Sequence, residues 1–328
     1  GVDVTVHEQD PTPTARNQGF RIHIDANGHT ALRTCLPPPT FDLVRRTSGT
    51  NDNVLGTYTH RLEEVMVQHF PDLTDDVITN VDRDTFRRAL LTDLDVHFGR
   101  SVAGYRVVAG GVRVEFTDGG TDEGDLLVGA DGVGSAVRRQ LLPHARVRDL
   151  GLRCLYGRTP LTDAIPHVLR HGFNWISDDK GLGAGFAPVR FRSGDTPDYL
   201  MVTLLGSEDD LGHTEGWHPA LRRVFAGVDE FFPIAIRAGQ RVIPWESGPV
   251  TLLGDAIHAM PPAGGVGANT ALQDAATLAG ELLSGKSVVD AVCAYERVML
   301  PRGFETIDGS LRMLDQMLMR QGVTSGVR

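Results

Sequence analysis

The segment that most constrains this chain spans residues 250 to 283, VTLLGDAIHAMPPAGGVGANTALQDAATLAGELL. An apolar strand ends at Gly254-Asp255, a loop with two prolines and three glycines follows, and a helix begins near Ala268-Asn269. A carboxylate at the end of a strand can bind a sugar hydroxyl, and glycines let the backbone approach a flat ring closely. The free N–H groups at a helix start favour an anion. The alternative is a structural strand–loop–helix junction.

A second element of this kind spans residues 125 to 143, DLLVGADGVGSAVRRQLLP. An apolar strand runs into Asp131-Gly132, and a helix begins between Ser135 and Arg139. A purely structural turn, in which Asp131 caps the helix, explains this pattern equally well.

The pattern along the chain predicts an interleaved α/β fold. Val2, Val4 and Val6 alternate with polar residues in a strand that ends near Glu8. Residues 82 to 94 predict an amphipathic helix that Asp82 caps, and Gly110-Gly111 and Gly119-Gly120 predict hairpin turns. Residues 151 to about 247 are rich in strands. Because strands typical of nucleotide binding lie at both ends of the chain, the β-rich section interrupts one domain.

Three further local features are predicted. We expect a turn at Asn27-Gly28, a strand in AGQRVIPW (residues 238 to 245), and an interruption near Pro301 in the C-terminal helices. GLGAG, at residues 181 to 185, predicts a hairpin turn more than a phosphate site, because no helix follows it. His258 is as well explained by bracing its loop as by a contact with a ligand.

Composition excludes several classes of protein. The formal net charge of the 328 residues is −10, which argues against a nucleic-acid partner. No 18-residue stretch is apolar enough to span a membrane, and three scattered cysteines indicate a reduced compartment, the cytoplasm. Almost all positive charge is arginine, which suggests a bacterial genome. No metal-ligand spacing stands out.

Together, the two strand–loop–helix elements resemble the paired signature of the single-component FAD-dependent aromatic hydroxylases, the family of p-hydroxybenzoate hydroxylase. Residues 254 to 269 match the family pattern GDAxHxxPPxxxxGxN without an insertion, and residues 131 to 138 match DGxxSxVR. Glu8 matches the carboxylate that binds the adenosine ribose. Arg16 and Arg83 match two arginines that reach the FAD.

The resemblance implies a site and an activity. Asp255 would bind the ribityl chain, and Ala268 and Asn269 would present backbone N–H groups to the flavin. Pro262, Gly264 and Gly267 would lie along the isoalloxazine, and Asp131-Gly132 would support the FAD pyrophosphate. The family consumes NAD(P)H and O2 and hydroxylates an aromatic or polyketide-like small molecule through a flavin C4a-hydroperoxide. No catalytic side chain and no metal are assigned, and we expect a monomer or homodimer without a membrane or nucleic-acid partner.

The resemblance also sets the expected domains. Residues 1–36, 79–150 and 248–290 would form a discontinuous Rossmann-like FAD-binding domain. Residues 37–78 and 151–247 would form a β-rich substrate domain, and residues 291–328 would be C-terminal helices.

One family element, a GxGxxG strand–loop–helix unit of about 25 to 30 residues, belongs before Glu8. We expect it to precede Gly1, with its strand in the middle of the sheet; truncation and loss of FAD binding are the alternatives. Because bound FAD would order that unit, we expect FAD to be absent or poorly ordered in a structure that begins at Gly1. A flavin halogenase is disfavoured because the tryptophans form no WxWxIP motif. The other class of function is a flavin-free homologue that binds small molecules or catalyses without a cofactor.

Overall fold

The computed structural model describes residues 2–15 and 20–318. Its strands are β1 Thr5–Glu8, β2 Arg21–His23, β3 Val54–Thr59, β4 Glu64–His69, β5 Asn80–Asp82, β6 Asp95–Phe98, β7 Val102–Val108, β8 Gly111–Phe116, β9 Thr121–Gly124, β10 Leu127–Gly129, β11 Val147–Pro160, β12 Phe173–Ser177, β13 Gly183–Val189, β14 Tyr199–Ser207, β15 Phe232–Gly239 and β16 Val250–Leu252. Its helices are α1 Ala26–Cys35, α2 Pro38–Thr47, α3 Arg83–Leu90, α4 Ala136–Leu141, α5 Pro219–Ala226, α6 Asp255–His258, α7 Gly267–Leu282 and α8 Val288–Leu318, with short 3₁₀ turns η1 His167–Arg170 and η2 Ala263–Gly265. The fold is therefore mixed α/β.

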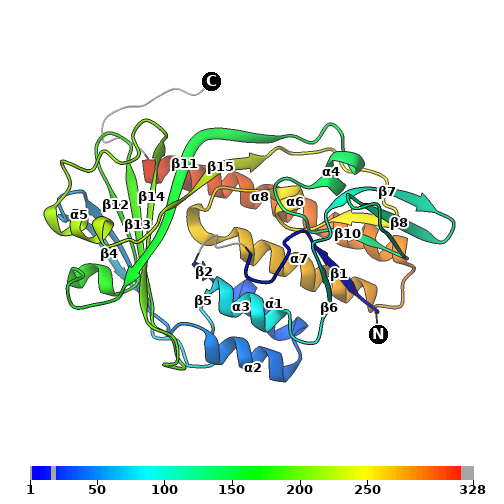
Figure 1. Cartoon of the computed structure of the whole chain (residues 1–328), viewed down its shortest axis with the longest axis horizontal. Helices are drawn as coiled ribbons and strands as arrows, with labels where there is room; N and C mark the ends of the chain where they lie inside the picture. The colour runs from blue at the N-terminus through cyan, green and yellow to red at the C-terminus, as the bar shows by residue number, and fades with distance from the viewer. Residues whose placement is uncertain (1, 16–19, 319–328) are drawn as a thin grey trace.

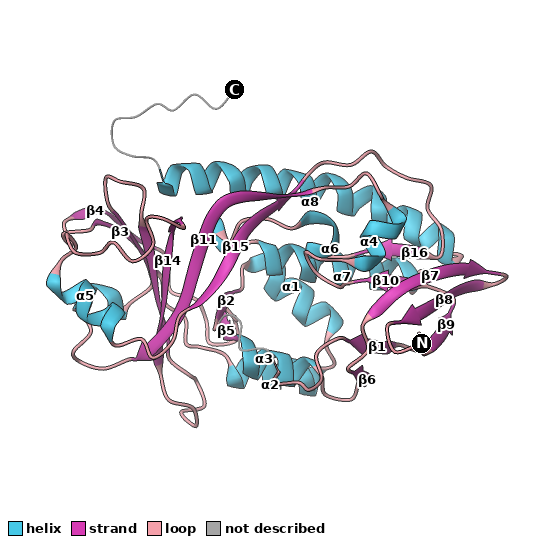
Figure 2. Cartoon of the chain, turned by 45° about the horizontal axis from the view of Figure 1, so that its top comes forward, coloured by secondary structure: helices cyan, strands magenta, loops and turns pink. Residues whose placement is uncertain are grey.

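A seven-stranded sheet forms one end of the molecule, in the order β15-β11-β14-β13-β12-β3-β4 (Figure 1). All its neighbouring strands are antiparallel except β3 and β12, which are parallel. One face packs against α5 through Leu221 and Val224, and the opposite face looks toward the rest of the molecule (Figure 2). The two faces therefore have different neighbours.

The other end is built from short parallel strand pairs and helices. Strand β1 pairs with β6, and β10 pairs with β16, both in parallel. No hydrogen-bonded ladder joins the two pairs among the described residues. The longest helix, α8, runs from this end to the sheet (Figure 1).

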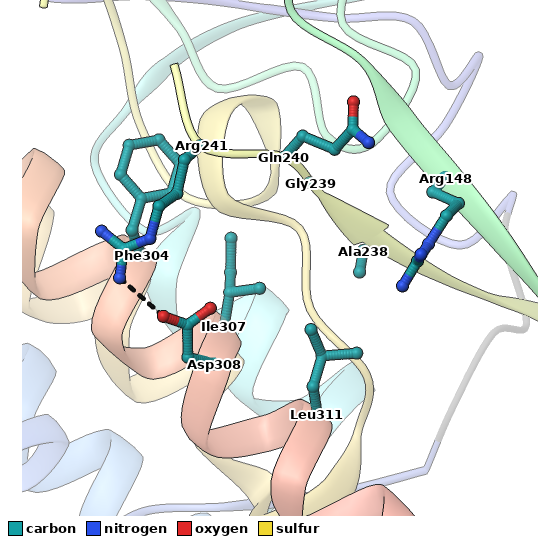
Figure 3. Close-up of a pocket in the computed structure, with 9 residues that line it drawn as sticks. All are labelled: Arg148, Ala238, Gly239, Gln240, Arg241, Phe304, Ile307, Asp308 and Leu311. Carbon is teal, nitrogen blue, oxygen red and sulfur yellow. Dashed lines mark hydrogen bonds and ion pairs between the residues drawn. The ribbon is translucent and has the colours of Figure 1, made fainter. Parts of the chain in front are cut away.

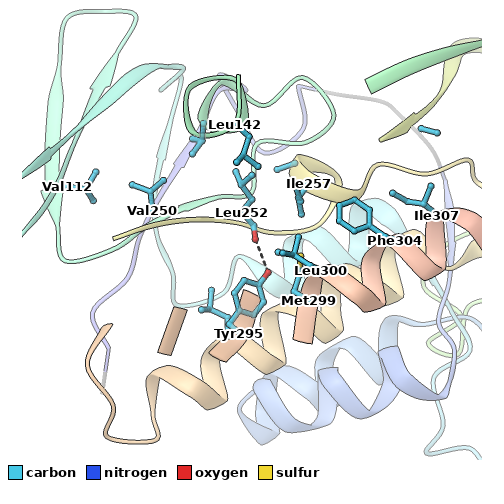
Figure 4. Packing of buried hydrophobic residues seen from close by; sticks show 14 residues of the cluster. Val112, Leu142, Val250, Leu252, Ile257, Tyr295, Met299, Leu300, Phe304 and Ile307 are labelled. Carbon is cyan, nitrogen blue, oxygen red and sulfur yellow. Dashed lines mark hydrogen bonds between the residues drawn. The ribbon is translucent and has the colours of Figure 1, made fainter. Parts of the chain in front are cut away.

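The core between β16 and α8 holds this end together. Leu252 is fully buried there with Tyr295, Met299 and Phe304 of α8. The hydroxyl of Tyr295 donates to the carbonyl of Leu252 at 2.8 Å, so the buried phenol is satisfied (Figure 4).

A third group of elements, α1, α2, α3, β2 and β5, connects the two ends. It shares a core that includes Leu32, Val44 and Phe86. Helix α2 packs here, whereas β3 and β4 join the large sheet. We therefore propose that the substrate domain begins after α2 and not at residue 37.

Several sequence predictions agree with these elements. Asp82 caps α3 by accepting from the N–H groups of Asp84 and Thr85. The hairpin turns at residues 110–111 and 119–120 are present, and GLGAG lies across the β12–β13 turn. No described helix is both long and apolar enough to cross a membrane.

Three predictions were wrong. Asn27 and Gly28 lie in the first turn of α1, because the Asp25 side chain accepts from the Gly28 N–H at 2.8 Å and starts a helix there. Strand β15 ends at Gly239, so most of residues 238 to 245 is not strand. Helix α8 continues through Pro301, whose exposed position places the lost backbone hydrogen bond toward water.

Candidate cofactor and substrate site

The GD loop, residues 253 to 266, turns sharply between β16 and α7. Gly254 has φ 62°, and Gly264 and Gly265 have φ 78° and 65°. Residues with a Cβ rarely adopt this left-handed backbone region, so these positions favour glycine. The conformation of the loop therefore depends on these three glycines.

The N-terminus of α7 is open to a ligand. No side chain caps it at Val266, and the N–H groups of Gly267, Ala268 and Asn269 make no hydrogen bond among the described residues. Free N–H groups at a helix start carry a partial positive charge. The backbone groups predicted to bind a flavin carbonyl are thus unpaired at this point.

The side chain of Asn269 joins this helix start to the rest of the site. It is 1% exposed, accepts from the Asp25 N–H at 3.0 Å, and donates to the carbonyls of His23 and Gly265. A Cβ on Gly28 would come within 1.9 Å of its oxygen. Gly28 therefore permits close packing of α1 on α7, and Asn269 has a structural role besides its backbone N–H.

A buried carboxylate that the sequence prediction missed, Asp274, lies behind the GD loop. Its Oδ2 accepts from the Gly254 N–H at 3.1 Å and lies 2.5 Å from His258 Nε2. Its Oδ1 accepts from Arg302 Nη2 at 2.8 Å. His258 therefore braces the loop, which was one of the two predicted readings. Gly303 leaves room for the His258 ring, since a Cβ there would lie 2.7 Å from it.

The DG segment is joined physically to the GD loop. Asp131 accepts from the N–H groups of Ala136 and Val137, and the Ser135 hydroxyl accepts from Arg138, so both cap α4. Arg138 is buried and donates to the carbonyl of Ala256 at 2.7 Å. The two sequence motifs thus form one unit, and Asp131 caps α4 within it. Gly132 has φ 72°.

Asp255 follows the left-handed Gly254 and starts α6. Its side chain keeps exposed surface, but loss of solvent raises the pKa of its carboxyl, an effect that His258 partly opposes. Such a carboxylate is accessible but has few water molecules around it, so a ligand hydroxyl can donate a hydrogen bond to it in place of water. Pro262 and Gly264 are exposed on the same loop.

The remaining predicted FAD residues lie near β1 and α3. Glu8 ends β1, where it accepts from the Asp10 N–H and pairs with Arg87 at 3.1 Å. Arg83 is the first residue of α3 and donates its backbone N–H to the carbonyl of Phe20. Arg16 lies outside the described residues.

The GD loop also contacts the inner face of the seven-stranded sheet, the face opposite α5. Ala263 shares a buried cluster with Trp175 of β12, against which Tyr156 and Phe173 pack while keeping part of their surface accessible. Tyr156 stacks on Phe232, with ring centroids 5.8 Å apart. This aromatic wall beside the loop suits a flat, apolar ligand.

A separate pocket lies between the end of β15 and α8, and none of the predicted site residues lines it (Figure 3). Its cavity volume is about 200 Å³, and its polar groups include Arg148 and the Arg241–Asp308 ion pair. The described residues include no cluster of three metal-ligating side chains.

Comparisons with known proteins agree with this geometry. Residues 231–310 match the family model of an FAD binding domain. The chain is 30% identical, over 96% of its length and 44% of the relative's, to a dual O-methyltransferase/FAD-dependent monooxygenase of Cercospora beticola. It is 32% identical, over 71% of its length and 60% of the relative's, to the 3-amino-4-hydroxybenzoate 2-monooxygenase of Streptomyces cremeus. The chain thus spans less than half of the Cercospora protein.

Solved structures share the fold over nearly the whole chain. A putative FAD-containing monooxygenase from Photorhabdus luminescens superposes with a TM-score of 0.83 and 27% identity, covering 97% of this chain and 93% of its own. HpxO of Klebsiella pneumoniae, solved with FAD and uric acid, superposes with a TM-score of 0.79 at 22% identity, covering 95% and 82% of the two chains.

Proposed function

The chain belongs to the FAD-dependent aromatic hydroxylase family, and from that premise we propose that it is an NAD(P)H-consuming monooxygenase of an aromatic or polyketide-like small molecule. The observation that carries the proposal is the helix start at Gly267, Ala268 and Asn269, whose N–H groups are unpaired among the described residues, at the end of the loop that begins with the accessible carboxylate of Asp255. These groups fit the carbonyl edge and the hydroxylated side chain of a flavin.

In this proposal, FAD supplies the reduction of O2 and the transfer of one oxygen atom to the substrate. The residues of this chain bind and orient. The α7 start and the exposed loop residues Pro262 and Gly264 hold the ring, and Asp255 holds the ribityl hydroxyls. Asp131, Gly132, Glu8, Arg16 and Arg83 serve the pyrophosphate and adenosine parts.

The aromatic wall on the inner sheet face would take the substrate. Tyr156, Phe173 and Phe232 come from three strands and lie on the side of the sheet where Ala263 of the loop packs. A substrate between wall and loop would lie against the flavin and exclude water from it. Burial holds the pKa of the Tyr156 phenol well above its usual range, so this hydroxyl stays protonated at neutral pH.

The edges of β1 and β10 support the expected GxGxxG unit. Each strand pairs on one side only among the described residues, and Val4 of the β1 segment is 58% exposed. A parallel strand between them would join the two pairs into one sheet and bring a helix start to the FAD pyrophosphate.

The proposed location is the cytoplasm, which suits the three free cysteines. The relatives come from both fungi and bacteria, and we propose a bacterial source for this chain.

The test uses the full-length protein supplied with FAD. We expect a yellow protein with a flavin absorbance band, and NADPH or NADH oxidation that an aromatic ligand accelerates. Asp255→Ala should lose FAD affinity, whereas Asp308→Ala, on the surface of α8, should keep it. A colourless wild-type protein that takes up no FAD would contradict the proposal and favour a flavin-free binding protein.

A further inference from the structure

Arg21 of β2 has a guanidinium that is unpaired among the described residues. Its Nε is buried and has no hydrogen-bond partner, and its guanidinium makes no hydrogen bond or ion pair among the described residues. Burial lowers the pKa of Arg21 to about 10, although nearby Tyr199 and Asp52 oppose the shift. A buried guanidinium N–H normally donates to a carboxylate or carbonyl oxygen.

The other arginines with a buried, unpaired nitrogen differ in this respect. Arg138 donates to two carbonyls, Arg170 pairs with Asp163, and Arg302 pairs with Asp274. Each therefore has a partner for another nitrogen of the same guanidinium. Arg83 also has partners, one of them Asp84 at 3.9 Å. The lack of a partner is thus particular to Arg21 within this group.

The carboxylates around Arg21 are engaged elsewhere. Asp82 lies opposite Arg21 in the β2–β5 ladder, but its Oδ1 caps α3 and its Oδ2 accepts from the Tyr199 hydroxyl at 3.0 Å. Asp52 Oδ2 accepts from the Gly172 N–H at 2.5 Å. Neither makes an ion pair with Arg21, so the guanidinium can still take an anion.

Arg21 lies in the chain between a residue that reaches the aromatic wall and one that reaches the GD loop. Residues i and i+2 of a strand share a face, so His23 lies on the same side of β2 as Arg21, and the His23 side chain contacts the position of Gly265. The residue before Arg21, Phe20, contacts Tyr199 and Phe232, with ring centroids 6.2 and 5.5 Å from its own, and Arg21 is close enough to Tyr199 to interact with it electrostatically. Phe232 in turn stacks on Tyr156, which completes the path back to the wall.

A second arginine adds positive charge to the same place. The Arg158 guanidinium lies 4.9 Å from the centre of the Phe20 ring and 5.6 Å from that of Tyr199. It makes no ion pair among the described residues either. Positive charge next to an aromatic wall favours a ligand that is both flat and anionic.

We propose that Arg21 is a specificity residue that binds an acidic oxygen of the substrate, a carboxylate or an ionised phenol or enol. This inference rests on the proposed function, because it takes the space between the GD loop and the inner sheet face as the substrate site.

The experiment measures binding and needs no turnover. Isothermal titration of the protein, with and without FAD, uses salicylate and 2-naphthoate as anionic probes and the matching amides as neutral probes. We expect the wild type to prefer the acids, and Arg21→Met to lose roughly tenfold to hundredfold in acid affinity while amide affinity stays within about twofold. Arg21→Lys should recover part of the loss.

Arg148→Gln is the matched control, because Arg148 is an exposed arginine in the separate pocket of Figure 3. It should bind the acids as the wild type does. The proposal is overturned if the wild type shows no preference for acids, if Arg21→Met weakens acids and amides equally, if Arg148→Gln carries the loss, or if Arg21→Met loses FAD affinity instead. A protein that binds acids through Arg21 but takes up no FAD would refute only the proposed function.

Discussion

The two faces of the seven-stranded sheet differ in which large aromatic side chains remain accessible. On the outer face, beneath α5, Ile176, Phe186, Leu200 and Val202 are all 0% exposed. On the inner face, Tyr156, Phe173 and Phe232 keep accessible surface, and Arg21 lies near Tyr199 of the cluster against which they pack. The outer face stabilises the fold, whereas the inner face leaves apolar and charged surface that a ligand can cover.

The largest effect is expected from Phe186→Ala on the outer face. Phe186 is fully buried and stacks on Phe225 at 5.8 Å between ring centroids. Its truncation should lower the free energy of unfolding by about 3–5 kcal/mol, because a cavity remains in a packed core. Urea unfolding measures the loss, and the folded fraction should bind aromatic ligands as the wild type does. A loss under about 1 kcal/mol would mean that the outer face contributes little to the stability of the fold.

Asp274→Asn should be next in size and should disturb the inner side. It leaves Arg302 and His258 without their buried anion, which costs roughly 3 kcal/mol. Asp274 also accepts a hydrogen bond from the Gly254 N–H. The variant should therefore disturb the conformation of the GD loop, and its FAD affinity should fall together with its stability. Asp308→Asn breaks an exposed pair with Arg241 and should change stability by no more than about 0.5 kcal/mol. Equal effects of the two variants would argue against a buried anchor behind the loop.

Local chemistry explains which parts the sequence predicted. Each motif lies in one short stretch of sequence, residues 254 to 269 and 131 to 138, and Asp82 caps α3 through its immediate neighbours. These features can be read without knowing the fold. The family, the mixed α/β fold and the strand-rich section followed from them.

Long-range contacts explain what the sequence did not predict. Asp274 lies 20 residues after Gly254, and only the fold brings them together. Gly28 was taken for a turn residue, whereas it makes room for Asn269, 241 residues away. Arg21 gave no sequence signal either, because a lone arginine in a strand does not reveal the absence of a partner. The available signal for Asp274 was an acidic residue at helical spacing from the apolar residues Ala271 and Leu278.

Phe173→Ala on the inner face is the direct counterpart of Phe186→Ala. Phe173 is only partly buried, so its truncation should cost about 1–2 kcal/mol, less than the outer-face variant. It should weaken aromatic ligands more than Phe186→Ala does, because it removes part of the wall. Parallel urea unfolding and ligand titration of both variants measure the contrast. If Phe173→Ala is the more destabilising and leaves ligand affinity unchanged, the two faces do not differ as inferred.

The smallest change, Asp255→Asn, should have the opposite sign on stability. Desolvation raises the folded-state pKa of Asp255 above its ordinary value of 3.8, so the folded chain favours the protonated carboxyl. Stability from this group is complete below that ordinary value and is lost as pH rises through the raised pKa. Asparagine cannot ionise, so the variant should melt about 1–2 °C higher than the wild type at pH 7.5 and at the same temperature near pH 3. Thermal unfolding at both pH values measures how much the ionised Asp255 carboxylate lowers stability. FAD titration at pH 7.5 tests whether the same carboxylate binds the flavin. A variant that is less stable at pH 7.5 and binds FAD normally would make Asp255 a structural residue.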